Sequence, residues 1–128
     1  MAQQVLIADD DASTLSGMRA LLTVWGYEVE TAPNGRAALE KITSAPPAVL
    51  VTDVVMPLMT GLELLDAVRI TRPAMPVIIL TAHSSLDTLM VAAAEGAFAY
   101  LPKPVDVAKL RAVLASALTE AKLETTAP

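Results

Sequence analysis

Two short apolar runs, each ending in aspartate, decide the expected fold: Val5-Leu6-Ile7-Ala8-Asp9-Asp10-Asp11 near the start and Ala48-Val49-Leu50-Val51-Thr52-Asp53 in the middle. Both runs have the length of a β-strand, and they are apolar at successive positions instead of alternating with polar residues. Such continuous runs are typical of parallel strands that helices cover on both faces. The two runs therefore predict a parallel sheet with carboxylates at the ends of its strands.

The rest of the 128-residue chain repeats this pattern, with short apolar runs alternating with amphipathic segments. The predicted strands are Val5–Ala8, Glu28–Thr31, Ala48–Thr52, Val77–Leu80 and Ala97–Leu101. The predicted helices lie near residues 13–25, 35–44, 61–71, 85–95 and 107–122, with glycines expected to end two of them (Gly26, Gly96) and polar residues to cap three (Asn34, Ser85, Asp106). Strict alternation predicts one α/β domain with a five-stranded parallel sheet, in the flavodoxin-like order 2-1-3-4-5, and five helices on its two faces.

Length and composition limit the number of domains and the classes of function. The length predicts one domain, which we place at residues 1–120, with residues 121–128 as a tail or the start of a linker. The chain has no cysteine, which excludes thiol chemistry and thiolate metal sites, and its net charge of −5 argues against direct nucleic-acid binding. No apolar run approaches the roughly 18 residues of a membrane-spanning helix, and the first residues do not resemble a signal peptide, so a cytoplasmic location without membrane contact is the default expectation.

Candidate site residues follow the predicted strands. In an open parallel sheet, ligands bind beyond the carboxyl ends of the strands, where the strand order reverses. That point lies between the first and third strands, so it brings Asp9, Asp10 and Asp53 into one crevice. Clustered carboxylates repel one another and need protons or a cation, and an oxygen-only donor set favours Mg²⁺. The fourth strand ends at Thr81 and the fifth near Lys103, so a hydroxyl and an ammonium are expected at the same rim, an environment suited to a transferring phosphoryl group.

At these residues the chain resembles the receiver domains of two-component response regulators. The resemblance runs from about Val5 to Leu118 and rests on four motifs in order: Val5 to Asp11, Thr52-Asp53-Val54-Val55-Met56-Pro57 with Gly61, Leu80-Thr81-Ala82, and Tyr100-Leu101-Pro102-Lys103-Pro104. Each motif is weak alone, but together they are specific because each falls at the end of a predicted strand.

The resemblance implies a role for each residue. Asp53 accepts a phosphoryl group from a sensor histidine kinase, and Mg²⁺ is held by Asp9, Asp10, Asp53 and the backbone carbonyl of Val55. Lys103 pairs with the phosphoryl oxygens, and the Lys103–Pro104 bond is expected to be cis. Thr81 and Tyr100 form the switch. Val55 and His83 occupy positions that tune the dephosphorylation rate in the family.

The resemblance also implies partners. The chain is a signalling receiver, not an enzyme acting on other substrates, and it controls an output domain or a downstream protein. The fourth predicted helix carries surplus apolar residues, so the face formed by that helix, the fifth strand and the fifth helix is a possible homodimer or output surface; a broad core contact explains them equally. The segment from Pro76 to Asp106 resembles receivers of nitrogen-regulation-type activators of sigma-54 promoters.

Other interpretations remain at this stage. Asp9-Asp10-Asp11 also fits the start of haloacid-dehalogenase-type Mg²⁺-dependent phosphohydrolases, with Asp9 as nucleophile and Asp11 as acid or base. Little chain is left for the additional elements of such enzymes, and Asp53 would have no role. A receiver-like binding module that never turns over phosphate is a third interpretation. Asp11 is expected mainly to cap the first helix, Gly61 to open the third, and His83 to be an ordinary surface residue.

Overall fold

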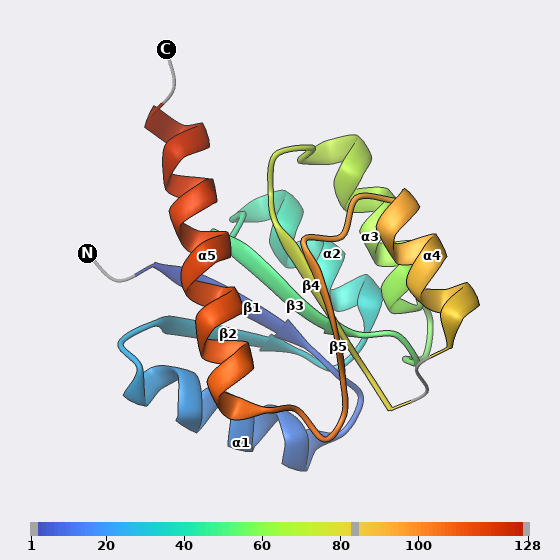
Figure 1. The fold of residues 1–128 in the computed structure, drawn as a ribbon, viewed down its shortest axis with the longest axis horizontal. Helices are drawn as coiled ribbons and strands as arrows, with labels where there is room; N and C mark the ends of the chain where they lie inside the picture. The colour runs from blue at the N-terminus through green and yellow to red at the C-terminus, as the bar shows by residue number, and fades with distance from the viewer. Residues whose placement is uncertain (1–2, 83–84, 127–128) are drawn as a thin grey trace.

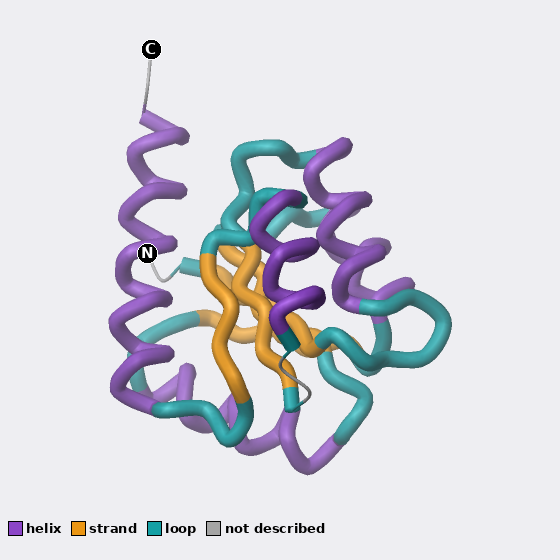
Figure 2. The backbone as a smooth tube through the Cα atoms, turned by 45° about the vertical axis from the view of Figure 1, so that its right-hand side comes forward, coloured by secondary structure: helices purple, strands orange, loops and turns teal. Residues whose placement is uncertain are grey.

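The computed structural model describes residues 3–82 and 85–126, with side chains through Thr119. In this part of the chain a five-stranded parallel sheet has the order β2-β1-β3-β4-β5, as predicted. The strands are β1 (Gln4–Ala8), β2 (Glu28–Ala32), β3 (Val49–Asp53), β4 (Val77–Thr81) and β5 (Ala99–Pro102). The helices are α1 (Ala12–Val24), α2 (Gly35–Ser44), α3 (Gly61–Thr71), α4 (Leu86–Ala94) and α5 (Val107–Thr126). Helices α1 and α5 cover one face, and α2, α3 and α4 cover the other (Figures 1 and 2).

The three central strands are buried on both sides, which explains their unbroken apolar sequence. Because successive side chains of a strand point to opposite faces, Val5 and Ile7 pack beneath α1 and α5, whereas Leu6 and Ala8 pack beneath α2, α3 and α4. The core is therefore two apolar layers, one on each side of the sheet.

The three predicted capping residues form their hydrogen bonds at the starts of α2, α4 and α5, which confirms the predicted caps. The side chain of Asn34 accepts a hydrogen bond from the Ala37 amide, and those of Ser85 and Asp106 accept bonds from the amides of Thr88 and Lys109. Gly26 and Gly96 have φ angles of +97° and +86°, in the left-handed region that glycine enters at little cost. These local signals could be read from sequence because each needs only neighbouring residues.

Most element boundaries differ from the prediction by one residue or more, and three elements show why. Strand β3 begins one residue later, at Val49, and includes Asp53, which pairs with Leu80 of β4. Strand β5 begins two residues later, at Ala99, because the Ala97 amide donates to the Ala92 carbonyl and still belongs to the end of α4. Helix α5 continues to Thr126 because residues 121–126 contain no glycine or proline to stop it. It passes the proposed domain end at residue 120, which itself stays a prediction.

No helix among the described residues is both long and apolar enough to cross a membrane.

Candidate phosphorylation site

The predicted acidic residues meet at the carboxyl edge of the sheet. Asp9 and Asp10 directly follow β1, and Asp53 ends β3, the neighbouring strand. One carboxylate oxygen from each of the three lies within 4.8 Å of the others. Asp9 is almost completely buried, Asp53 is partly exposed and Asp10 is exposed, so the group forms an open-sided pocket. Three hard oxygen ligands at this spacing fit the donor set that Mg²⁺ prefers.

Lys103 is the cation of this pocket. Its Nζ atom lies 2.8 Å from Oδ2 of Asp9 and 3.1 Å from Oδ2 of Asp53, so one ammonium group bridges two strands. Burial alone would lower the pKa of Lys103, but its hydrogen bonds to Asp9 and Asp53 and their charges outweigh burial and raise that pKa above the ordinary value of 10.5. The lysine is therefore held as a full positive charge beside both carboxylates. The Lys103–Pro104 bond is cis, as predicted.

Backbone hydrogen bonds fix the orientation of the carboxylates. The Asp11 amide donates to Oδ1 of Asp9 at 2.9 Å, and the Val54 amide donates to Oδ1 of Asp53 at 2.7 Å. In Asp9 and Asp53, one oxygen is thus bound by the backbone and the other faces Lys103. In both residues the Oδ2 atom is thus the one that pairs with the ammonium.

Asp11 has the capping role that the sequence predicts. Its side chain accepts hydrogen bonds from the amides of Ser13 and Thr14 at the start of α1. The backbone hydrogen bond from Thr14, and then that from Ser13, lower the pKa of Asp11. Its carboxylate is committed to the helix end and stands apart from the carboxylate trio.

The two predicted switch residues lie on adjacent strands. Thr81 ends β4 and is buried, and its carbonyl accepts a hydrogen bond from the Lys103 amide at 2.7 Å. Tyr100 lies in β5 and packs against the apolar layer beneath α2, α3 and α4. Among the described residues its buried hydroxyl has no hydrogen-bond partner.

The structure describes one of the two predicted rate-tuning positions, and its role stays a prediction. Val55 follows Asp53 by two positions, and its side chain is 58% exposed, so it stands in solvent beside the pocket. His83 lies outside the described residues.

Sequence reasoning missed why Gly61 is required. A Cβ atom at this position would lie 2.0 Å from the carbonyl oxygen of Asp53, so any larger residue would collide with the backbone of Asp53. The Gly61 amide also donates to the Val54 carbonyl at 2.8 Å. Gly61 therefore closes the connection between β3 and α3 and does more than open a helix. The only signal of this contact in the sequence was a glycine eight positions after Asp53.

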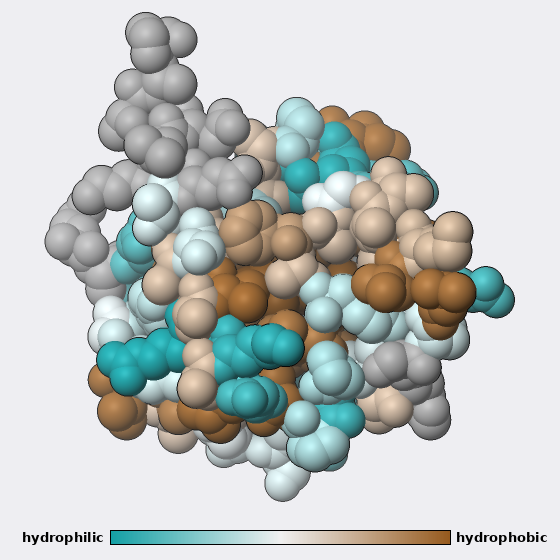
Figure 3. Space-filling model, viewed as in Figure 1, coloured by the Kyte–Doolittle hydropathy of each residue, from teal (hydrophilic) through white to brown (hydrophobic). Residues whose placement is uncertain are grey.

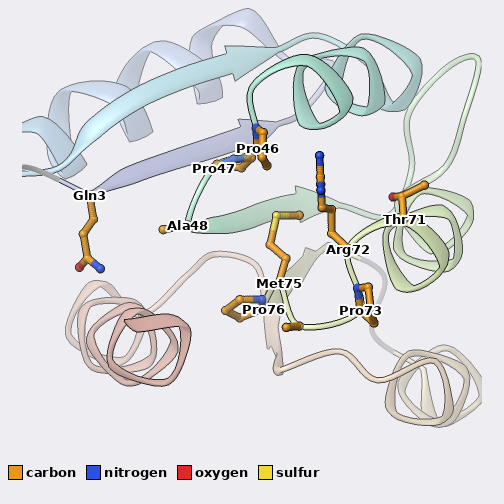
Figure 4. A pocket seen from close by; sticks show the side chains of 10 residues that line it. Gln3, Pro46, Pro47, Ala48, Thr71, Arg72, Pro73, Met75 and Pro76 are labelled. Carbon is orange, nitrogen blue, oxygen red and sulfur yellow. The ribbon is translucent and has the colours of Figure 1, made fainter. Parts of the chain in front are cut away.

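A separate cavity of about 410 Å³ lies at the opposite edge of the sheet, where the strands begin (Figure 4). Its lining comes from the start of the chain and from the connections that precede β3 and β4, and includes Gln3, Pro46, Arg72 and Met75. None of the lining residues is a carboxylate, so this cavity is distinct from the acidic pocket.

Comparison with known proteins agrees with this geometry. Residues 5–115 match the family described as the response regulator receiver domain. The chain belongs to this family. The receiver domain is 41% identical to the transcriptional regulatory protein ZraR of Klebsiella oxytoca over 93% of its own length, and 41% identical to the DNA-binding transcriptional regulator NtrC of Escherichia coli (strain K12) over 90%. It spans about a quarter of those relatives (27% and 24%).

Solved structures show the same relationship. The receiver domain superposes on a response regulator receiver domain protein from Clostridium thermocellum with a TM-score of 0.90 and 36% identity, covering 96% of this chain and 98% of the other. With a CheY-like receiver domain protein from Methanospirillum hungatei the TM-score is 0.92 at 33% identity, covering 97% and 99%. Receivers of this family interact with histidine kinases and output domains. These comparisons give the phosphohydrolase alternative no support.

Proposed function

We propose that Asp53 is the residue that accepts the phosphoryl group, in a step that requires Mg²⁺. The observation that carries the proposal is the ammonium of Lys103 held between Asp9 and Asp53, with a third carboxylate, Asp10, beside them. A nucleophilic carboxylate, a fixed positive charge and a set of cation ligands at one edge of the sheet are the parts that phosphoryl transfer needs.

The bonds change in a simple displacement. The Oδ2 atom of Asp53 attacks the phosphorus of a phosphohistidine on the kinase, and the P–N bond breaks with its electron pair returning to the imidazole. The Val54 amide holds the other oxygen of Asp53, so the nucleophilic atom is oriented before the donor arrives. Lys103 moves its hydrogen bonds from the carboxylates to the incoming phosphoryl oxygens, which keeps the developing charge paired.

Asp9, Asp10, Asp53 and the carbonyl of Val55 would hold the Mg²⁺ ion. Bound there, the ion neutralises negative charge on the carboxylates and the phosphoryl oxygens, which lets two anions approach each other. Asp9 is nearly buried and would bind with little rearrangement, whereas exposed Asp10 is free to bind through water.

The signal would leave the site through Thr81 and Tyr100. The Thr81 hydroxyl is proposed to bond the phosphoryl group, and Tyr100 to change its packing in response. Both residues lie on the strands that run beneath α4, so a shift in either alters the surface formed by α4, β5 and α5.

That surface is our candidate for a homodimer or output contact. Apolar side chains gather over α4 on the face shown in Figure 3, and the exposed ones are Leu86, Leu89, Met90 and Val91. Exposed apolar surface of this kind marks interaction sites more often than chance. Residues 121–128 would lead from the receiver domain toward an output domain, such as the DNA-binding part of an NtrC-like regulator, in the cytoplasm.

Labelling with radioactive acetyl phosphate tests the proposal. The wild-type protein should take up label only with Mg²⁺ present, and Asp53→Asn should abolish it. Retention of label in Asp53→Asn combined with its loss in Asp9→Asn would refute the proposal and favour the phosphohydrolase. Absence of label in every protein, together with no Mg²⁺-dependent beryllofluoride binding, would indicate an inert module.

A further inference from the structure

The connection between β3 and α3, residues 54–60, is held from outside by helix α2. We call this connection the phosphorylation loop. A Cβ atom at Gly35, the first residue of α2, would lie 2.3 Å from the carbonyl oxygen and 2.8 Å from the Cβ of Met59 in this loop. We propose that Gly35 is a positioning residue for the phosphorylation site: its missing side chain lets α2 clamp the loop through Met59. The inference rests on the proposed role of Asp53.

Space, and not backbone freedom, is the reason for glycine at this position. Gly26 and Gly96 have left-handed φ angles, but Gly35 does not. Glycine is a poorer helix former than alanine, so helix propensity does not account for its presence at the start of α2. Gly35 is buried against the loop, and the absence of a Cβ atom lets the backbone of Met59 approach α2 closely. This close approach is what glycine contributes at this position.

Both sides of the contact between Gly35 and Met59 are rigid. The side chain of Asn34 accepts a hydrogen bond from the Ala37 amide at 2.8 Å, and its carbonyl accepts one from Ala38, so the first turn of α2 is fixed. On the other side, the colliding atoms belong to the backbone and Cβ of Met59 and not to a flexible side-chain end. An added methyl group would therefore displace the loop by well over half an ångström before the contact reached 3.0 Å.

A displacement of Met59 would also move the residues of the site, because the same loop contains both. At one end it begins with Val54, whose amide orients Asp53, and continues with Val55, whose carbonyl is a proposed Mg²⁺ ligand. Gly61 ties the two ends of the loop together, through its bond to the Val54 carbonyl. Gly35 fixes the loop to a different helix at Met59, close to the start of α3, and the two contacts together leave the loop little freedom. Displacements near 1 Å in a reacting geometry cost as much as about 100-fold in rate.

The test compares two glycine-to-alanine variants. Gly35→Ala adds a methyl group against Met59, whereas the matched control Gly17→Ala adds one on the exposed side of α1, with nothing within 4 Å. Amide NMR spectra without metal, Mg²⁺ titrations followed by NMR, and acetyl-phosphate labelling are measured on both. We expect Gly35→Ala to shift the amide signals of residues 53–61, to weaken Mg²⁺ binding by about fivefold or more and to slow labelling. Gly17→Ala should match the wild type.

A second variant keeps the test decisive if Gly35→Ala does not fold. Met59→Gly removes the Cβ that rests on Gly35 and frees the loop from α2 without adding an atom to the helix. It should also weaken Mg²⁺ binding. Wild-type Mg²⁺ affinity and wild-type amide signals in whichever of the two variants fold would overturn the inference. A wild-type protein that binds Mg²⁺ but takes no label at Asp53 would contradict the proposed function instead, since the Mg²⁺ and amide measurements do not depend on phosphorylation.

Discussion

The ammonium of Lys103 lies 2.8 Å from Oδ2 of Asp9, a carboxylate 94 positions earlier in the chain and nearly buried. The same ammonium lies 3.1 Å from Oδ2 of Asp53. This bridge joins the ends of β1, β3 and β5, and it places a positive charge beside Asp53, where the proposed phosphoryl transfer would add negative charge. Among the described residues, Lys103 is thus the side chain that pairs with two of the three carboxylates of the pocket.

Removing that charge should have opposite effects on stability and on Mg²⁺ binding. In Lys103→Met, Asp9 and Asp53 lose their cation, so unfolding in urea without metal should require about 1–3 kcal/mol less free energy. Mg²⁺ should bind severalfold more tightly because the competing charge is gone, and should restore much of the stability. Lys109→Met, at an exposed position of α5, is the control. Unchanged Mg²⁺ affinity in Lys103→Met would contradict this account of the pocket.

The raised pKa of Lys103 predicts a loss of stability in alkaline solution. A group whose pKa is higher in the folded state contributes stability that is complete below its unfolded pKa, about 10.5, and that disappears as pH rises through the folded pKa. The difference in unfolding free energy between wild type and Lys103→Met should thus stay constant from about pH 8 to about pH 10 and shrink above that. Urea denaturation across this range measures it. A difference in unfolding free energy that increased with pH would contradict the raised pKa of Lys103.

Leu58 carries backbone strain in the phosphorylation loop. Its φ angle is +70°, which costs a residue with a side chain about 1–2 kcal/mol, and its side chain is 68% exposed and packs little. Leu58→Gly should therefore stabilise the domain by about 0.5–1 kcal/mol, after the entropy cost of glycine in the unfolded chain. Leu58→Ala keeps the Cβ and should give no such gain. Equal stabilities of the two variants, measured by urea denaturation, would show that the strain is absent.

Arg69 holds the connection between α3 and β4. Its guanidinium donates to the carbonyl of Pro73 at 2.7 Å and to that of Met75. Arg69→Met leaves these carbonyls without their donor and should lower the free energy of unfolding by about 1–3 kcal/mol. Arg72→Met, a neighbouring exposed arginine, should change it by less than about 0.5 kcal/mol. Similar losses in both variants would show that charge, not the two hydrogen bonds, is responsible.

Val55 follows Asp53 by two positions and is exposed, and we propose that its side chain influences the water that would attack the Asp53 phosphate. We expect Val55→Asn to change the half-life of the Asp53 phosphate severalfold, because an amide can order or compete for that water whereas valine cannot. Val24→Asn makes the same change at a position 83% exposed at the far end of α1 and should leave the half-life unaltered. Decay of labelled protein measures both. An unaltered decay rate in Val55→Asn would show that this position does not tune the reaction.

Much of the fold follows from the sequence because its signals are local. The apolar runs of β1, β3 and β4 predict burial on both faces, and the capping residues of α2, α4 and α5 predict where these helices start. The boundaries of the elements follow less well from the sequence. The start of β5 depends on whether the Ala97 amide bonds to α4 or to the sheet, and contacts with residues outside this segment decide between the two.

The sequence by itself determined the parallel sheet, its strand order and the gathering of Asp9, Asp10, Asp53, Thr81 and Lys103 at one edge, because alternation and right-handed crossovers leave few other arrangements. Only the tertiary structure decided that one ammonium bridges Asp9 and Asp53, and that Gly35 and Gly61 have no room for a side chain. These features depend on distances of 2–3 Å between segments far apart in the chain, and no periodicity or motif spacing specifies a distance that small.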